Sequence, residues 1–198
     1  TSDKIIVATK FDGSLCEERL QVNDSPGVNF NGAPEHKEIT ERMLQEQNYD
    51  LLIYIMNATQ LGTTDEATHL KRVQQLAGKI PILFVINKMD AVNAEEENVL
   101  ALLQEQWAFL QENGFVHPAI CPVSSKAAFL AKRFAAGNLS RSEERELYCS
   151  VDKFEKMNLP AYYAKAVPKV YIKGAKTEEE QLLKTSGFTY VEKLIDSY

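Results

Sequence analysis

Short apolar runs alternate along the chain with amphipathic segments, and this pattern predicts strands that alternate with helices. Three apolar runs stand out, over residues 50–56, 80–86 and 119–123. The run over 50–56 is nearly continuous, which is typical of an interior strand covered on both faces of a sheet, and the run over 80–86 also predicts a buried strand. Helices are predicted over about 35–47, from Thr64 or Asp65 to near Gly78, over about 95–112, and from the end of the third run to about Ala136, where Gly137 can end the helix.

The first part of the chain predicts an antiparallel hairpin. Residues 4–9 are rich in β-branched side chains, and residues 17–23 alternate between apolar and polar side chains. Asp12-Gly13 lies between them and suits a turn. The second strand of this hairpin would end at Asp24.

Strands that alternate with helices predict an α/β fold, in which a mainly parallel sheet carries helices on both faces. Ligands of such sheets bind at the carboxyl ends of the strands. In the predicted helix 95–112, four apolar side chains share one face, and we expect the tryptophan among them to lie in the core. They are Leu100, Leu103, Trp107 and Leu110.

The alternation divides the chain into three parts. We expect a partial α/β unit over 1–138, a partly helical insertion over 139–185, and a terminal helix over 186–198 that packs back on the first part. Possible capping boxes in the insertion are Ser140 with Glu143 and Thr177 with Glu180. The terminal helix is predicted from the apolar spacing of Val191, Leu194, Ile195 and Tyr198.

Composition narrows the class of protein. Of the 198 residues 44% are hydrophobic, enough for a buried core, and the net charge is −6. No basic cluster occurs, so neither nucleic-acid binding nor direct anchoring on anionic lipid is expected as the main role. The three cysteines show no metal or disulfide pattern, which favours a cytoplasmic setting. The chain begins at Thr1, almost directly before its first predicted strand, which suggests an excised fragment.

The tetrapeptide Asn87-Lys-Met-Asp90 follows the predicted strand 80–86. A carboxylate held in plane accepts the N1–H and the N2 amine of guanine as a bidentate pair, and we assign this role to Asp90. Adenine lacks this donor pair, so such a site could prefer guanine by ~10⁴–10⁵. Asn87 can donate to the base edge and link the neighbouring loops, and the stem of Lys88 can cover the face of the base. The alternative is a polar turn after a strand.

A second motif, Ser124-Ser-Lys126, follows the predicted strand 119–123. We expect Ser125 to donate its backbone N–H to guanine O6, Ser124 to support the loop, and Lys126 to cover the base. The serines could instead serve as the N-cap of the next helix. The tetrapeptide upstream favours the nucleotide role.

A third motif, Asp24-Ser-Pro-Gly27, belongs to the phosphate end of the expected site. An aspartate at the end of a strand can hold Mg²⁺, often through a water, and Asp24 is the candidate metal ligand. Gly27 lets the backbone approach a γ-phosphate, to which its N–H can bond. The alternative is an ordinary turn, for which this composition is also suited.

The phosphate-binding loop Gly-x-x-x-x-Gly-Lys-Ser/Thr does not occur in these 198 residues. Gly27 and Gly32 have the required spacing, but Ala33 stands in the place of the lysine. The backbone amides and the lysine of that loop supply much of the phosphate binding in such proteins. We therefore assign no catalytic residue and expect negligible catalysis by this chain alone.

Together these motifs resemble those of the dynamin superfamily of large GTPases, specifically bacterial dynamin-like proteins. The resemblance covers about residues 18–137 and extends to the terminal helix from Ser186. It rests on Asn23-Asp-Ser-Pro-Gly-Val-Asn29, Glu38-Ile-Thr40, Ala58-Thr-Gln-Leu-Gly62 with Asp65-Glu66, the segment from Pro81 to Asp90, and Pro122-Val-Ser-Ser125. Ser25 stands where the family often has threonine, and the absent phosphate loop is the larger departure.

The resemblance implies a P-loop-NTPase-like fold whose N-terminal part is missing here. It implies binding of GTP or GDP with Mg²⁺, and a multidomain parent, a hydrolase, that uses GTP hydrolysis for self-assembly or membrane-associated remodelling. It further implies that the parent self-associates through its nucleotide face. Contact with a membrane would then come only from regions outside this chain, so the parent would be cytoplasmic or peripheral to a membrane.

Two other hypotheses remain open. The first is a non-enzymatic pseudo-GTPase that serves as an interaction module and naturally lacks the phosphate loop. The second is a GTPase of translation or ribosome assembly. A phosphate loop upstream of Thr1 would favour an enzyme, an initiator methionine just before Thr1 would favour the interaction module, and an RNA-binding domain downstream would favour the ribosomal role.

The purified chain is expected to bind GTP weakly and to show no measurable GTP turnover, because it lacks the groups that hold the phosphates. Isothermal titration calorimetry and a phosphate-release assay measure both properties. A submicromolar dissociation constant for GTP would contradict this expectation.

Overall fold

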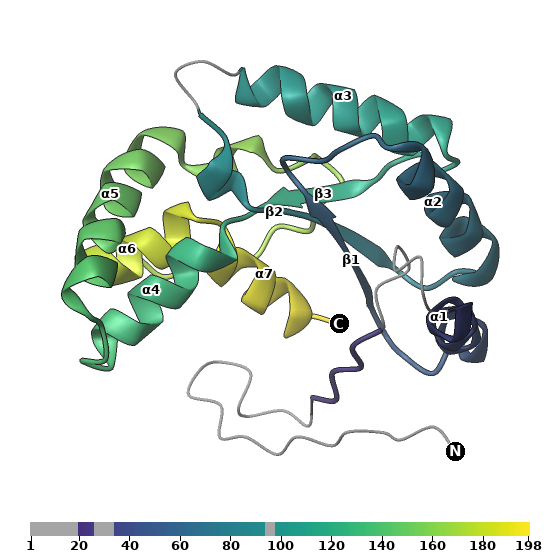
Figure 1. The fold of residues 1–198 in the computed structure, drawn as a ribbon, viewed down its shortest axis with the longest axis horizontal. Coiled ribbons are helices and arrows are strands. Elements are labelled where there is room, and N and C mark those ends of the chain that lie inside the picture. Colours follow the sequence, from purple (N-terminus) through teal and green to yellow (C-terminus); the bar gives the residue numbers. More distant parts are fainter. Residues whose placement is uncertain (1–19, 26–33, 94–97) are drawn as a thin grey trace.

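Three parallel strands form the centre of the molecule (Figure 1). The computed structural model describes residues 20–25, 34–93 and 98–198. The strands are β1 (Leu52–Asn57), β2 (Ile82–Asn87) and β3 (Ala119–Pro122), and β2 lies between the other two. Asn57 is in register with Asn87, and Ile86 is in register with Pro122. The three strands therefore end at one edge of the sheet, and the α/β class is confirmed.

Helices occupy most of the remaining described chain. They are α1 (Pro34–Glu46), α2 (Thr64–Leu76), α3 (Val99–Glu112), α4 (Ser125–Ala135), α5 (Arg141–Met157), α6 (Glu178–Thr185) and α7 (Phe188–Ile195), with the short 3-10 turns η2 (Met89–Ala91) and η3 (Leu159–Tyr162). In Figure 1, α4, α5 and α6 lie together on the left of the sheet and α1 and α2 on its right. Among the described helices, none is long and apolar enough to cross a bilayer.

Side chains of β2 alternate between two hydrophobic clusters, one on each face of the sheet. Phe84 and Ile86 belong to the larger cluster, which includes side chains from α2 to α6. Leu83 and Val85 belong to the smaller cluster, which includes Val191 and other side chains of α7 and of β3. The central strand is thus covered on both faces, and the prediction that the run 80–86 forms a buried strand is confirmed. Because helices pack on both faces, β2 is held firmly, and so is the segment that follows it.

The prediction that strand 50–56 is covered on both faces is wrong for β1. Met56 is buried, but the side chain of Ile55 is 68% exposed. Within the described residues β1 has one neighbouring strand, so it lies at an edge of the sheet. An apolar run cannot distinguish a central strand from an edge strand, because the difference depends on which segments pair with it.

The prediction for the buried face of α3 is also wrong. Leu103 and Leu110 are buried, but Trp107 is 39% exposed and Leu100 is 51% exposed. The face that packs on the sheet contains Val99, Leu103, Gln106 and Leu110. The helical period was predicted correctly, but the buried face of α3 is shifted around the helix by about one residue from the predicted face. The shift is possible because α3 carries apolar side chains on two adjacent faces.

Only part of the predicted N-terminal hairpin can be compared. Residues 4–9 and 17–19 lie outside the described residues, as does Gly27. Residues 20–25 are described, and they belong to no strand. Leu20 and Val22 are 44% and 74% exposed. The predicted second strand is therefore not formed over residues 20–23.

Most helix ends follow the predicted capping chemistry. Ser140 and Glu143 form a full capping box at the start of α5. Thr177 caps α6, but the Glu180 carboxylate accepts from the Lys176 N–H instead of completing a box. The N-cap of α2 is Thr63, one residue before the predicted position. The terminal helix α7 forms as predicted, although Tyr198 lies beyond its end.

Two glycines with positive φ offer a matched test of packing at the C-terminal end. Gly187 has φ +81°, and a Cβ there would lie 2.7 Å from both the Pro122 carbonyl oxygen and the Tyr163 hydroxyl. Gly137 has φ +69° and nothing within 4 Å of such a Cβ. Gly137→Ala is expected to lower the free energy of unfolding by ~1–2 kcal/mol, because alanine disfavours the left-handed backbone conformation. Gly187→Ala should lower the free energy of unfolding by ~1–3 kcal/mol more than Gly137→Ala does, because the added methyl group would also overlap its two neighbours.

Urea unfolding of the two variants measures this difference. Equal losses of unfolding free energy would contradict the close contact between Gly187 and the end of β3.

Candidate functional site

The site is built where β2 and β3 end. After Asn87, Lys88 adopts a left-handed backbone conformation with φ +66°, which turns the chain out of the strand into η2. Met89 is fully buried, and its N–H donates to the Val123 carbonyl oxygen at 3.2 Å. One buried side chain and one backbone hydrogen bond therefore fix the tetrapeptide against the end of β3.

Asn87 connects the tetrapeptide to the start of α4. Its Oδ1 accepts a hydrogen bond from the Ser125 backbone N–H at 3.0 Å. Because a backbone N–H is a donor, the amide oxygen must face Ser125, and the amide NH₂ must face the other way. That NH₂ donates to no other group in the described parts of the chain. The Ser125 N–H, which we expected to donate to a base, is thus held by Asn87 in this structure.

Asp90 is oriented by the hydroxyl of Ser124. The Ser124 side chain is fully buried, donates from Oγ to Asp90 Oδ1 at 2.7 Å, and accepts from the Ala127 N–H at 3.1 Å. Ser124 is also the N-cap of α4, so the two predicted roles of this serine coexist. Asp90 is partly buried, and its second carboxylate oxygen accepts no hydrogen bond from the residues that the structure describes.

Two lysines flank these groups. Lys88 is exposed, next to Asn87. Lys126 is also exposed, and its Nζ forms an ion pair with the Glu146 carboxylate of α5. The hydrogen bond to Glu146, with a smaller effect from the charge of Asp90, raises the pKa of Lys126. Lys126 therefore remains a cation, and in this structure its ammonium points to α5.

Three residues from distant parts of the chain support the site through hydrogen bonds. The Ser124 N–H donates to the Ser186 carbonyl oxygen at 3.0 Å. The Tyr163 hydroxyl donates to the Gly187 carbonyl oxygen at 2.8 Å, and burial raises the pKa of Tyr163, so this donor stays protonated. On the other side, Lys153 of α5 donates to two carbonyl oxygens of the η2 region.

No pattern in the sequence predicts these supporting residues. Ser186, Tyr163 and Lys153 lie in segments without a recognisable motif, and each acts through a backbone carbonyl group that any residue could provide. The capping box at Ser140 located the helix that carries Lys153, but nothing in the pattern indicated the partner of this lysine.

Of the residues predicted to bind phosphate and metal, only Asp24 is described. Asp24 is exposed, and it forms no hydrogen bond or ion pair with other described residues. Gly27 lies outside the described residues. Within residues 20–25, 34–93 and 98–198, no group of three or more histidine, cysteine or acidic side chains is suited to a metal ion. The structure thus assembles the part of the site assigned to the base.

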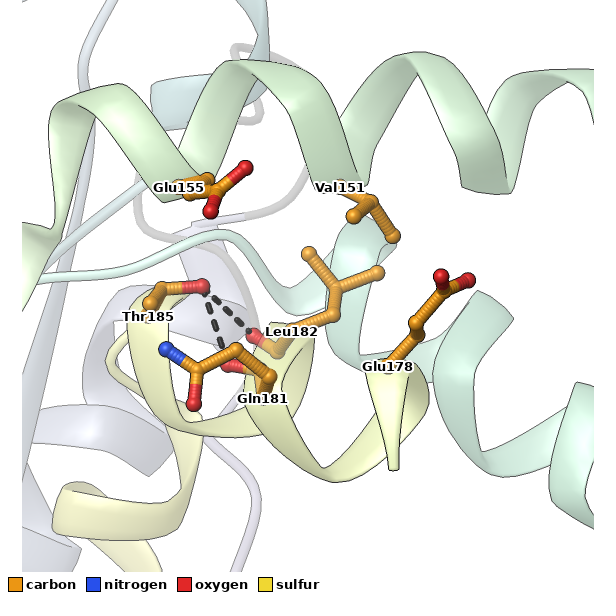
Figure 2. Close-up of a pocket in the computed structure, with 6 residues that line it drawn as sticks. All are labelled: Val151, Glu155, Glu178, Gln181, Leu182 and Thr185. Carbon is orange, nitrogen blue, oxygen red and sulfur yellow. Dashed lines mark hydrogen bonds between the residues drawn. The ribbon is translucent and has the colours of Figure 1, made fainter. Parts of the chain in front are cut away.

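Neither of two cavities in the described part of the chain includes Asn87, Asp90 or Ser125 in its lining. One, of about 330 Å³, is bounded by the segment after β1 and by α3. The other, of about 150 Å³, lies between α5 and α6 (Figure 2), where the Thr185 hydroxyl donates to carbonyl oxygens of its own helix. The candidate base site is the set of polar groups at the ends of β2 and β3.

Replacing the two adjacent serines separates their roles. Ser124→Ala is expected to lower the free energy of unfolding by ~1–3 kcal/mol, because it removes a helix cap and leaves Asp90 without its donor. Ser125→Ala should change it by less than ~0.5 kcal/mol, because Ser125 contributes its backbone N–H. Urea denaturation of both variants measures this contrast, and an equal effect would show that the Ser124 hydroxyl does not stabilise the fold.

The chain has no detectable match among known proteins: no protein-family model, curated protein or solved structure is significantly similar to it. The polar groups at the ends of β2 and β3 are thus the features from which a function can be inferred.

Proposed function

We propose that the chain is the guanine-binding portion of a dynamin-like GTPase with a P-loop-NTPase-like fold. One observation carries this proposal: two hydrogen bonds join the tetrapeptide to the serine motif. The Ser125 N–H donates to Asn87 Oδ1, and the Ser124 hydroxyl donates to Asp90 Oδ1. A polar turn after a strand has no need of two side-chain bonds to one neighbouring loop. A base-binding site needs them, because it must present donors and acceptors in a fixed plane.

The arrangement suits the edge of guanine. The Asp90 carboxylate, oriented by Ser124, accepts from N1–H and from the exocyclic amine as a bidentate pair. The Asn87 NH₂, turned away from Ser125, donates to the acceptor side of the base. An adenine base would leave Asp90 desolvated without donors, which disfavours adenine nucleotides.

The lysines complete the proposed site. The Lys88 stem can lie along one face of the base while its ammonium remains in water. Lys126 can cover the other face once its ammonium moves from Glu146 or shares that carboxylate. Both side chains of this ion pair are about half exposed, so breaking the pair to move the Lys126 ammonium costs little free energy.

The phosphate end of the proposal depends on the sequence alone. Asp24 would bind Mg²⁺, and Gly27 would bind the γ-phosphate through its N–H. When bound, the metal would neutralise charge on the phosphates. The residues described at the ends of β2 and β3 would select the base and fix its orientation.

Asp90→Asn tests the base assignment directly. The asparagine carbonyl can keep the Ser124 bond, but its NH₂ meets the guanine amine as a donor facing a donor. Affinity for GDP is expected to fall ~10- to 100-fold, consistent with the loss of one charged hydrogen bond. Affinity for xanthosine diphosphate should rise, because its C2 oxygen accepts where guanine donates. Chemical-shift titrations by NMR measure both dissociation constants.

Asp152→Asn on the exposed side of α5 is the matched control, because it makes the same chemical change away from the site. Its ratio of GDP to xanthosine diphosphate affinity should equal that of the unmodified chain. An Asp90→Asn protein that is folded and keeps the original ratio would overturn the proposed function.

A further inference from the structure

Helix α5 reaches the proposed base site through one partly buried contact and one exposed contact. Lys153 Nζ lies 2.6 Å from the carbonyl oxygen of Asp90 and 2.6 Å from that of Val92. Glu146, two turns earlier on α5, forms the ion pair with Lys126. Both contacts join the region predicted to be an insertion to residues of the two base-binding motifs.

We infer that Lys153 is a positioning residue that sets the orientation of the Asp90 carboxylate and thereby the selectivity for guanine. The inference rests on the proposed function. It extends that function by assigning part of the selectivity to α5, a helix that contains none of the base-binding motifs.

The η2 turn has few internal hydrogen bonds to hold its shape. It is closed by Ala91 N–H to the Lys88 carbonyl oxygen at 2.9 Å and by Val92 N–H to the Met89 carbonyl oxygen at 3.3 Å. The carbonyl groups at the end of such a turn have no partners within it. The ammonium of Lys153 supplies two donors to this end.

The position of Lys153 is itself well fixed. Its neighbour Phe154 is fully buried, and Leu147 and Met157 on the same helix are also buried in the larger hydrophobic cluster. A helix anchored at three points along its length places the root of Lys153 reproducibly. The lysine therefore transmits the position of α5 to the peptide group of Asp90.

Asp90 is consequently held from two sides. Ser124 holds its side chain, and Lys153 holds its main-chain carbonyl group. Without Lys153 the peptide after Asp90 can rotate, and the carboxylate can rotate with it about the remaining Ser124 bond. Bidentate acceptance from guanine requires both oxygens in the plane of the base, and hydrogen bonds weaken steeply as their angles deviate.

The Glu146–Lys126 pair is not expected to perform the same task. Its side chains are 44% and 54% exposed, and exposed pairs of this kind contribute little. It also involves a residue that would contact the face of the base, where guanine and hypoxanthine are alike. Selectivity between these two bases depends on the amine that donates to the Asp90 carboxylate. Lys153 is the residue of α5 that contacts Asp90, so the selectivity is expected to depend on Lys153.

The test compares the binding of GDP and of inosine diphosphate, which lacks only that amine. Chemical-shift titrations by NMR on the whole chain give both dissociation constants for the unmodified protein and for Lys153→Met, Lys153→Arg and Lys156→Met. Lys153→Met keeps most of the apolar stem and removes the donors. Lys156 lies one turn further along α5 and is exposed, so Lys156→Met is the matched control.

The unmodified chain should prefer GDP over inosine diphosphate. In Lys153→Met this preference should fall at least threefold toward equality, while Lys153→Arg should restore most of it, because arginine can also donate to both carbonyl groups. Lys156→Met should retain the full preference. A loss of stability alone would weaken both nucleotides equally and would leave the ratio unchanged.

Two results would overturn the inference while leaving the proposed function intact. One is a folded Lys153→Met protein with the original preference, and the other is equal weakening of both nucleotides. If Lys153→Met does not fold, Lys153→Gln replaces it, and an unchanged preference in that variant has the same meaning. An unmodified chain that shows no preference for GDP would overturn the proposed function and this inference together.

Discussion

The Ser124 hydroxyl has one proton to donate, and the structure of the site depends on where that proton goes. It goes to the Asp90 carboxylate, while the hydroxyl oxygen accepts the N–H of Ala127 at the start of α4. The side chain is fully buried, so water cannot replace either partner. Leaving a buried polar group unpaired costs about 1–3 kcal/mol. The start of α4 and the orientation of Asp90 are therefore coupled through a single atom.

This coupling is possible because the sheet is parallel. The last residues of β2 lie in register with those of β1 and β3, so the segments after the strands leave at the same edge. The Val123 N–H donates to the Ile86 carbonyl oxygen at 2.8 Å, and the Met89 N–H donates back to Val123. Residues far apart in sequence thus meet within hydrogen-bonding distance. An antiparallel pair would place the two motifs at opposite edges.

The C-terminal part of the chain completes the site without contributing a motif of its own. The Ser186 carbonyl group accepts from Ser124, and Lys153 donates to the carbonyl group of Asp90. Phe154 and Leu182 also share the hydrophobic cluster that contains Ile86. The helices after α4 therefore contribute both to the core and to the position of the candidate base-binding groups.

Local signals were sufficient to predict the three strands, the capped start of α5 and the two motifs that meet at the ends of β2 and β3, because apolar runs, capping side chains and the motif after each strand depend only on neighbouring residues. The exposed face of β1 at Ile55, the exposure of Trp107 and the partner of Lys153 were decided only by the tertiary structure. Each depends on which segments pack beside the residue. A run of apolar side chains shows that a surface can be buried, whereas burial itself requires a neighbour, and the identity of that neighbour is not a local property.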